Sequence, residues 1–205
     1  MDEGLKTSVG AIVLAAGLST RMGKPKMLLP WDEKPIIRHV IEILLTTGLQ
    51  HIVIVTGGYK ELIDPLLSDT PVVNVFNSEF SNGEMLNSVQ VGLKALPDSI
   101  QTAFLVLGDQ PTITSGIFST LLETISPRDP KIIIPSYHFR RGHPWVIHRY
   151  FWQQIMDLTP TQTLRNFLSN NENFIQYVEF TSPEILQDLD TPQDYEKFKP
   201  RKKRP

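Results

Sequence analysis

Residues 10–26 read GAIVLAAGLSTRMGKPK, a short apolar run followed directly by a loop of small, hydroxyl and basic residues. The run Gly10–Leu14 is aliphatic and predicts a buried strand. In an open α/β sheet, ligands bind beyond the carboxyl ends of the strands, and the loop after Leu14 lies at such an end. The stretch therefore predicts an α/β fold with a ligand site at its first loop.

The rest of the chain alternates short apolar runs with longer segments of helical period, which indicates βαβ units on a mostly parallel sheet. Further strands are expected at His51–Thr56, Val72–Phe76, Ala103–Leu107 and Lys131–Pro135, and helices at Pro35–Thr47, Lys60–Leu67, Met85–Leu96 and Ser115–Thr124. Pro35 is placed in the first helical turn, where its missing donor is harmless.

After Pro135 the pattern changes. The sequence predicts an irregular or antiparallel insertion at Tyr137–His148, two helical stretches, a strand at Phe174–Phe180 and a final helix beginning near Pro192. No internal repeat or linker interrupts the chain, so we expect one domain over residues 1–200 and a basic tail at 201–205.

Composition excludes several classes of protein. The chain has 205 residues, 20 Lys+Arg against 22 Asp+Glu, and no cysteine. A net charge of -2 gives no case for nucleic-acid binding, and the lack of cysteine excludes a disulfide scaffold, iron–sulfur ligation and a thiol nucleophile. No apolar run approaches the roughly 20 residues needed to span a bilayer, and the acidic start Met1–Lys6 has no signal core. We therefore expect a cytoplasmic protein that binds neither nucleic acid nor membranes.

The first loop has the chemistry of a phosphate site. Small residues at 15–17 let backbone N–H groups approach a phosphate, Ser19 and Thr20 add hydroxyl donors, and Arg21 and Lys26 add positive charge. The spacing fits neither the P-loop nor the G-x-G-x-x-G fingerprint. An ordinary glycine-containing loop with a solvated basic rim is the alternative.

Carboxylates follow two other segments. Asp109 follows the apolar run Leu105–Leu107 and Gly108. Asp188 and Asp190 are spaced i, i+2, which puts both side chains on one face of an extended backbone. Two or three such oxygen ligands suit Mg²⁺. The alternatives are a turn residue before Pro111 for Asp109 and a helix N-cap near Pro192 for the other two.

Two more segments carry polar side chains of interest. Asn82–Ser88 precedes an expected helix and offers donors to a base or phosphate, or simply caps that helix. Arg141 and His143 lie in the insertion and suit an anionic group, or form a solvated basic turn. A zinc site from His138, His143 and His148 fails, because a spacing of five separates the side chains on either a strand or a helix.

The pattern L-A-A-G-x-S-x-R-M-G-x-x-K, from Leu14 to Lys26, resembles the signature of the nucleotidyltransferases related to molybdenum cofactor guanylyl- and cytidylyltransferases. Gly108-Asp109-Gln110-Pro111 and the segment Asp188–Asp194 match further elements of that family. Arg141-Gly142-His143-Pro144 resembles an element of its cytidylyltransferase branch, and the segment from Gly83 to Ser88 is similar to another element but one residue longer.

The resemblance implies a three-layer, Rossmann-like (glycosyltransferase-A-like) nucleotidyltransferase fold and a set of site residues. It implies catalytic Arg21 and Lys26, nucleotide contacts from Leu14, Ala15, Ala16, Gly17, Ser19 and Ser88, Mg²⁺ ligands Asp109 and Asp190 with Asp188 as a third, and acceptor contacts from Arg141 and His143.

The implied reaction transfers CMP from CTP, or another nucleoside monophosphate from its triphosphate, to molybdopterin with release of pyrophosphate. It would support maturation of xanthine dehydrogenase-type enzymes of purine catabolism, with an apo-molybdenum hydroxylase as a further partner. The alternatives are transfer to a sugar or alcohol phosphate, and a non-catalytic chaperone that delivers the cofactor. The charge distribution agrees with a phosphate-binding rim and a metal-binding end, because residues 21–38 hold five basic side chains against two acidic ones and residues 160–198 hold seven acidic against two basic.

Overall fold

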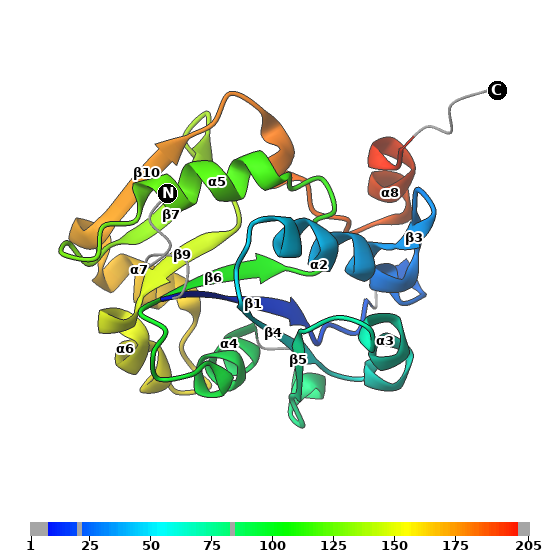
Figure 1. Cartoon of the computed structure of the whole chain (residues 1–205), viewed down its shortest axis with the longest axis horizontal. Coiled ribbons are helices and arrows are strands. Elements are labelled where there is room, and N and C mark those ends of the chain that lie inside the picture. The colour runs from blue at the N-terminus through cyan, green and yellow to red at the C-terminus, as the bar shows by residue number, and fades with distance from the viewer. Residues whose placement is uncertain (1–7, 20–21, 83–84, 201–205) are drawn as a thin grey trace.

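The computed structural model describes residues 8–19, 22–82 and 85–200, so the expected basic tail at 201–205 lies outside the described residues. Its centre is an eight-stranded sheet in the order β10-β7-β9-β6-β1-β4-β5, with β8 paired to β7 (Figure 1). The strands are β1 Val9–Ala15, β4 His51–Thr56, β5 Val73–Phe76, β6 Thr102–Leu107, β7 Ile132–Tyr137, β8 Arg140–Arg141, β9 Trp145–His148 and β10 Ile175–Glu179.

The sheet is mostly parallel. β1 runs parallel to both β4 and β6, β4 to β5, and β10 to β7. β9 lies between β6 and β7 and is antiparallel to both. The expected insertion at Tyr137–His148 thus supplies two short strands, β8 and β9, each antiparallel to β7, which is the antiparallel one of the two forms expected.

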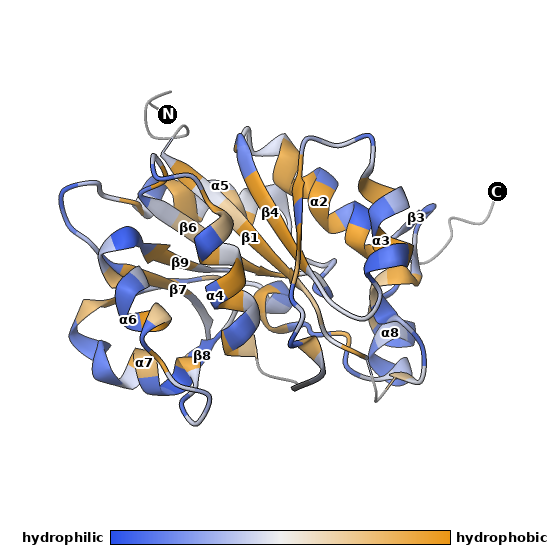
Figure 2. Ribbon diagram, turned by 90° about the horizontal axis from the view of Figure 1, so that it is seen from below, coloured by the Kyte–Doolittle hydropathy of each residue, from blue (hydrophilic) through white to orange (hydrophobic). Residues whose placement is uncertain are grey.

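Helices cover both faces of the sheet, which makes three layers (Figure 2). The helices are α2 Ile36–Thr46, α3 Lys60–Leu67, α4 Met85–Ala95, α5 Ser115–Thr124, α6 Trp152–Met156, α7 Leu164–Asn170 and α8 Pro192–Phe198. Alternate side chains of β1 are buried in two separate hydrophobic cores, one on each face of the sheet. Val13 belongs to the core with α2 and α5, whereas Ile12 belongs to the core with α4, α6 and α7. The central strands carry apolar side chains on both faces because both faces are covered.

A short hairpin before α2 departs from the prediction. β2 Pro30–Trp31 pairs antiparallel with β3 Lys34–Pro35, and Pro35 has an extended ψ of 146°, so the helix begins at Ile36. The sequence placed Pro35 in the first helical turn. Strands of two residues carry no periodicity, and only the pairing of Pro35 with Pro30 distinguishes the two conformations.

The register of the central strands places two loops side by side. Leu14 of β1 stands opposite Leu107 of β6, and the Gly108 N–H donates to the Leu14 carbonyl at 3.0 Å. The loop after β1 and the loop that carries Asp109 therefore leave the same edge of the sheet together.

Within residues 8–19, 22–82 and 85–200, none of the helices has both the length and the apolar character required to cross a bilayer.

Candidate functional site

A cavity of about 570 Å³ opens at the carboxyl edge of β1 and β6. Its size falls in the range of small-molecule sites, roughly 300–1,000 Å³. The first loop forms its floor and rim through Leu14, Ala16, Gly17, Leu18 and Ser19. Four of these residues are expected nucleotide contacts, and Leu18 is an addition. The expected contact Ala15 is buried in the core at the end of β1 and does not line the cavity.

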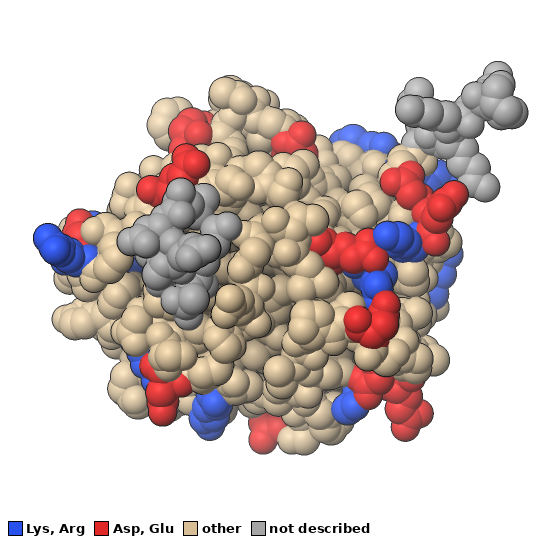
Figure 3. Space-filling view, in the orientation of Figure 1, with Lys and Arg blue, Asp and Glu red and all other residues tan. Residues whose placement is uncertain are grey.

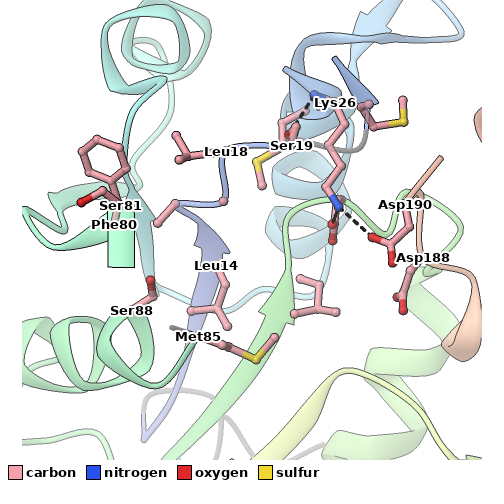
Figure 4. A pocket seen from close by; sticks show the side chains of 16 residues that line it. Leu14, Leu18, Ser19, Lys26, Phe80, Ser81, Met85, Ser88, Asp188 and Asp190 are labelled. Carbon is pink, nitrogen blue, oxygen red and sulfur yellow. Dashed lines mark hydrogen bonds and ion pairs between the residues drawn. The ribbon is translucent and has the colours of Figure 1, made fainter. Parts of the chain in front are cut away.

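One end of the cavity is charged. The Lys26 ammonium forms an ion pair with Asp109 and donates to Asp190 Oδ1 at 3.2 Å (Figure 4). Burial lowers the pKa of Lys26, but the two carboxylates more than offset this and raise its pKa above the usual value. Lys26 therefore stays charged at neutral pH, with two carboxylates directed at one cation.

Asp188 and Asp190 both line the cavity, as the i, i+2 spacing predicted. Leu189 between them is fully buried in the core, which fixes the two aspartates on the opposite side. Asp188 accepts a hydrogen bond from the Gln110 amide. Burial raises the pKa of Asp188, and the nearby charges of Asp109 and Asp190 add to the effect.

The helix-cap alternative for Asp188 and Asp190 does not hold. Thr191 is the N-cap of α8, and its hydroxyl accepts from the Asp194 N–H while the Asp194 carboxylate accepts from the Thr191 N–H. With that capping box complete, Asp188 and Asp190 are left facing the cavity.

At the other end of the cavity, the lining side chains that the structure describes are uncharged. Phe80, Ser81, Met85 and Ser88 lie there, across the cavity from Lys26, Asp188 and Asp190 (Figure 4). Ser88 lies inside α4, is 6% exposed and is not the helix cap considered as the alternative. The cavity thus combines an ionic end with a neutral end of hydroxyl and apolar groups.

One contact from a neighbouring loop and one within the first loop fix the first loop in place. The Tyr59 hydroxyl donates to the Leu18 carbonyl at 2.8 Å, and Ser19 Oγ accepts from the Lys26 N–H at 3.2 Å. Gly57 allows this approach, because a Cβ there would lie 2.5 Å from the Ala16 carbonyl oxygen. Tyr59 itself does not line the cavity and acts on it through the backbone of Leu18.

Replacing Tyr59 by phenylalanine is expected to loosen the first loop without touching the ligand. Because a single neutral hydrogen bond is lost, we expect KM for the nucleotide to rise about 2- to 10-fold at nearly unchanged kcat. Steady-state kinetics measure this. Tyr150→Phe is the matched control, because Tyr150 is exposed and does not line the cavity. An unchanged KM in Tyr59→Phe would refute the positioning role.

The expected basic rim is only partly present. Among the five basic residues of 21–38, Lys26 enters the cavity and Lys24 is exposed, whereas Arg21 lies outside the described residues. Lys34 and Arg38 both pair with Glu42, and Arg38 also pairs with Asp69. Figure 3 shows acidic and basic side chains interleaved where α2 and α3 lie, as this network requires.

The structure places Arg141 and His143 outside the cavity lining. Arg141 is exposed on β8, where its Nε donates to the Tyr177 hydroxyl at 2.8 Å and its guanidinium lies over the Tyr177 ring. The His143 ring stacks on Trp145 with centroids 4.7 Å apart. Burial lowers the pKa of His143 to about 4, so the ring is neutral at pH 7 and offers no charge to an anion.

His143 makes folding stability depend on pH. Its Nδ1 is buried without a hydrogen-bond partner among the described residues, so a second ring proton has no acceptor. The unfolded chain binds that proton near pH 6.5, the folded chain only near pH 4, and stability therefore rises with pH between these values.

We expect His143→Gln to remove about 2 kcal/mol of the change in unfolding free energy between pH 5 and pH 7. Urea unfolding of both proteins at the two pH values measures the difference. All other titrating groups are shared, so equal pH slopes in the two proteins would contradict this assignment.

Several side chains that shape the site were not predicted. Gln110 lies in the segment Gly108-Asp109-Gln110-Pro111, and its position next to Asp109 could have indicated that it contributes to the site. Tyr59, Phe80 and Asn77 act through contacts between different segments of the chain, for which the sequence held no periodic or spacing signal.

No group of three or more His, Cys, Asp or Glu side chains is placed to hold a metal ion by itself within the part of the chain that the structure describes. Any Mg²⁺ here would need ligands beyond the protein.

Comparisons with known proteins identify the family of the chain. Residues 11–174 match the model of the MobA-like NTP transferase domain. The molybdenum cofactor cytidylyltransferase of Escherichia coli K12 is 30% identical over 191 residues, which is 92% of this chain and 94% of that protein. The nicotine blue oxidoreductase of Paenarthrobacter nicotinovorans is 29% identical over 147 residues, 68% of this chain and 70% of that protein.

Among solved structures, a nucleotidyl transferase from Methanothermobacter superposes with a TM-score of 0.80 at 20% identity, covering 94% of this chain and 96% of that one. At this identity the likeness concerns the fold, which is the α/β architecture expected from the sequence. The family match over most of the chain carries the assignment further: this chain belongs to the MobA-like NTP transferase family and is a nucleotidyltransferase.

Proposed function

We propose that this enzyme transfers CMP from CTP to molybdopterin and releases pyrophosphate. The observation that carries the proposal is the convergence of Lys26, Asp109 and Asp190 at one end of a cavity whose other end is lined by uncharged side chains among the described residues. The ionic end suits a triphosphate with its counterions, and the neutral end suits a nucleobase. The identity to the cytidylyltransferase of E. coli over most of both chains supports the choice of donor and acceptor.

The chemistry requires little of the protein beyond binding and charge. A phosphate oxygen of the acceptor attacks the α-phosphorus of CTP, a new P–O bond forms, and the bond to the bridging oxygen of the β-phosphate breaks. The acceptor oxygen is already anionic, so no general base is needed. Catalysis then rests on alignment and on stabilising charge around the α-phosphate, and Lys26 is the described cation in the cavity that can do so.

The donor set fits Mg²⁺. Asp109 and Asp190 both direct carboxylate oxygens at the Lys26 ammonium. The same two carboxylates could therefore bind a second cation, such as a metal ion, beside Lys26. Mg²⁺ commonly binds one or two carboxylates and completes its shell with water and substrate phosphates. We propose Asp109 and Asp190 as its ligands. Asp188, the third expected ligand, would have to move toward them to join the shell, because no group of three such side chains is placed to hold a metal among the described residues. A bound Mg²⁺ would supply neutralisation of the pyrophosphate leaving group.

We also propose that Arg21 is a second catalytic cation and that Arg141 and His143 contact the acceptor. Arg21 lies outside the described residues, and the other two lie outside the cavity lining. Delivery of the product to an apo-molybdenum hydroxylase is a further proposal that rests on the named activity of the E. coli relative alone.

An acceptor panel tests the proposal. The purified enzyme is given CTP or GTP together with molybdopterin, a sugar 1-phosphate or an alcohol phosphate, and pyrophosphate release is measured. We expect release with CTP and molybdopterin. Release only with a sugar or alcohol phosphate would make the alternative transferase correct. A carrier without chemistry, or an activity like that named for the nicotine blue relative, would give no pyrophosphate with any pair.

A further inference from the structure

Ser88 at the neutral end of the cavity is held by a single buried side chain. Asn77, which follows β5 and is 1% exposed, donates from Nδ2 to Ser88 Oγ at 3.0 Å. No sequence motif includes Asn77, and Asn77 does not itself line the cavity.

The orientation of the Asn77 amide is determined by its other contact. The backbone N–H of Glu79 donates to Asn77 Oδ1 at 3.0 Å, so that atom must be the oxygen and the atom facing Ser88 must be the nitrogen. The Asn77 N–H is also bonded, to the Thr56 carbonyl at 2.8 Å, which ties the residue to the end of β4. The direction of the Asn77–Ser88 hydrogen bond is therefore fixed.

This direction fixes what Ser88 offers to a ligand. A hydroxyl has one proton and two lone pairs, and one lone pair of Ser88 accepts from Asn77. No acceptor for the Ser88 proton is found among the described residues, and Ser88 lines the cavity. The hydroxyl proton is thus available to a ligand, and the complementary ligand atom is a hydrogen-bond acceptor.

We propose that Asn77 is a positioning residue for nucleotide recognition: it holds the Ser88 hydroxyl as a donor toward an acceptor atom of the nucleobase. The inference rests on the proposed function, because it takes the neutral end of the cavity as the place of the base.

Asn77→Asp tests the polarity directly. The aspartate keeps the size of the side chain and the bond from the Glu79 N–H, but as a carboxylate it accepts from Ser88 and turns the hydroxyl proton away from the cavity. We expect the Kd for CTP to rise about 5- to 30-fold, with kcat at saturating CTP within about twofold of wild type. Isothermal titration and pyrophosphate release measure the two quantities.

Ser88→Ala and the double variant make the test specific. If Asn77 acts through the Ser88 hydroxyl, Asn77→Asp changes the Kd by less than about twofold once that hydroxyl is removed. A merely structural role predicts the same loss in both backgrounds. If Asn77→Asp does not fold, Asn77→Ala in both backgrounds replaces it, since it also removes the amide donor.

The outcomes separate the two claims. Wild-type protein that binds neither CTP nor GTP would overturn the proposed function together with this inference. Wild-type binding with an unchanged Kd in the Asn77 variant would overturn the inference alone, and so would an equal loss in the Ser88→Ala background.

Discussion

Lys26→Ala is expected to reduce nucleotidyl transfer by about 10²- to 10³-fold in kcat, the usual loss when a preorganised stabilising group is removed. Among the residues that the structure describes, Lys26 is the basic side chain that lines the cavity, where it contacts both Asp109 and Asp190. Its ammonium is charged at neutral pH because the two carboxylates raise its pKa. Pyrophosphate release at saturating substrate is the measurement.

Lys34→Ala is the matched control for this loss. Lys34 comes from the same basic stretch but is exposed and pairs with Glu42 away from the cavity. We expect it to leave kcat within about twofold of wild type, as for a surface substitution that touches no ligand. An equal loss in both variants would mean that overall basic charge, and not the position of Lys26, supports the reaction. Circular dichroism confirms that each variant is folded.

Asp109→Asn is expected to give a similar loss of about 10²- to 10³-fold in kcat while keeping the fold. The asparagine has the same shape, but it removes the charge that pairs with Lys26 and that we propose for Mg²⁺. A second readout needs no substrate: Mg²⁺ alone should raise the Tm of the wild-type protein and leave that of the variant nearly unchanged.

Asp129→Asn serves as the control for Asp109→Asn, because Asp129 is exposed and pairs with Lys131 at 3.4 Å. It should retain both transfer and the Mg²⁺ response. A variant Asp109→Asn with full activity would show that this carboxylate has no part in the reaction, and an undiminished Mg²⁺ response would exclude it as a ligand.

The fold was predictable because its signals are local. The apolar runs from Gly10 to Leu14 and from His51 to Thr56 are short and aliphatic, and both form central parallel strands. Each expected strand and helix is present, some with the predicted ends and the others with ends shifted by a few residues. The hairpin Pro30–Pro35 was missed because two-residue strands have no period, and its pairing places Pro35 before the helix.

The site was predictable where a motif carries the residues. Asp188 and Asp190 share a face because Leu189 between them enters the core, which is the physical reason for the i, i+2 pattern. Their approach to Asp109, about 80 positions earlier in the chain, came only from the resemblance to the family, since long-range contacts leave no local periodicity.

Other contacts were beyond the sequence for the same reason. The bond from Tyr59 to Leu18 joins two loops, and the bond from Asn77 to Ser88 joins a loop to helix α4; these segments meet only after the sheet has formed. The neutral state of His143 depends on burial against Trp145, which the basic character of its neighbours Arg140 and Arg141 concealed.

The most direct test of the central claim follows the α-phosphate of the nucleotide. CTP labelled at the α-phosphate, and in a parallel reaction at the γ-phosphate, is incubated with the enzyme, Mg²⁺ and molybdopterin. We predict that the α-label appears in the molybdopterin product and the γ-label in pyrophosphate. Appearance of the γ-label as inorganic phosphate, or failure of the α-label to enter any acceptor, would contradict nucleotidyl transfer at this site.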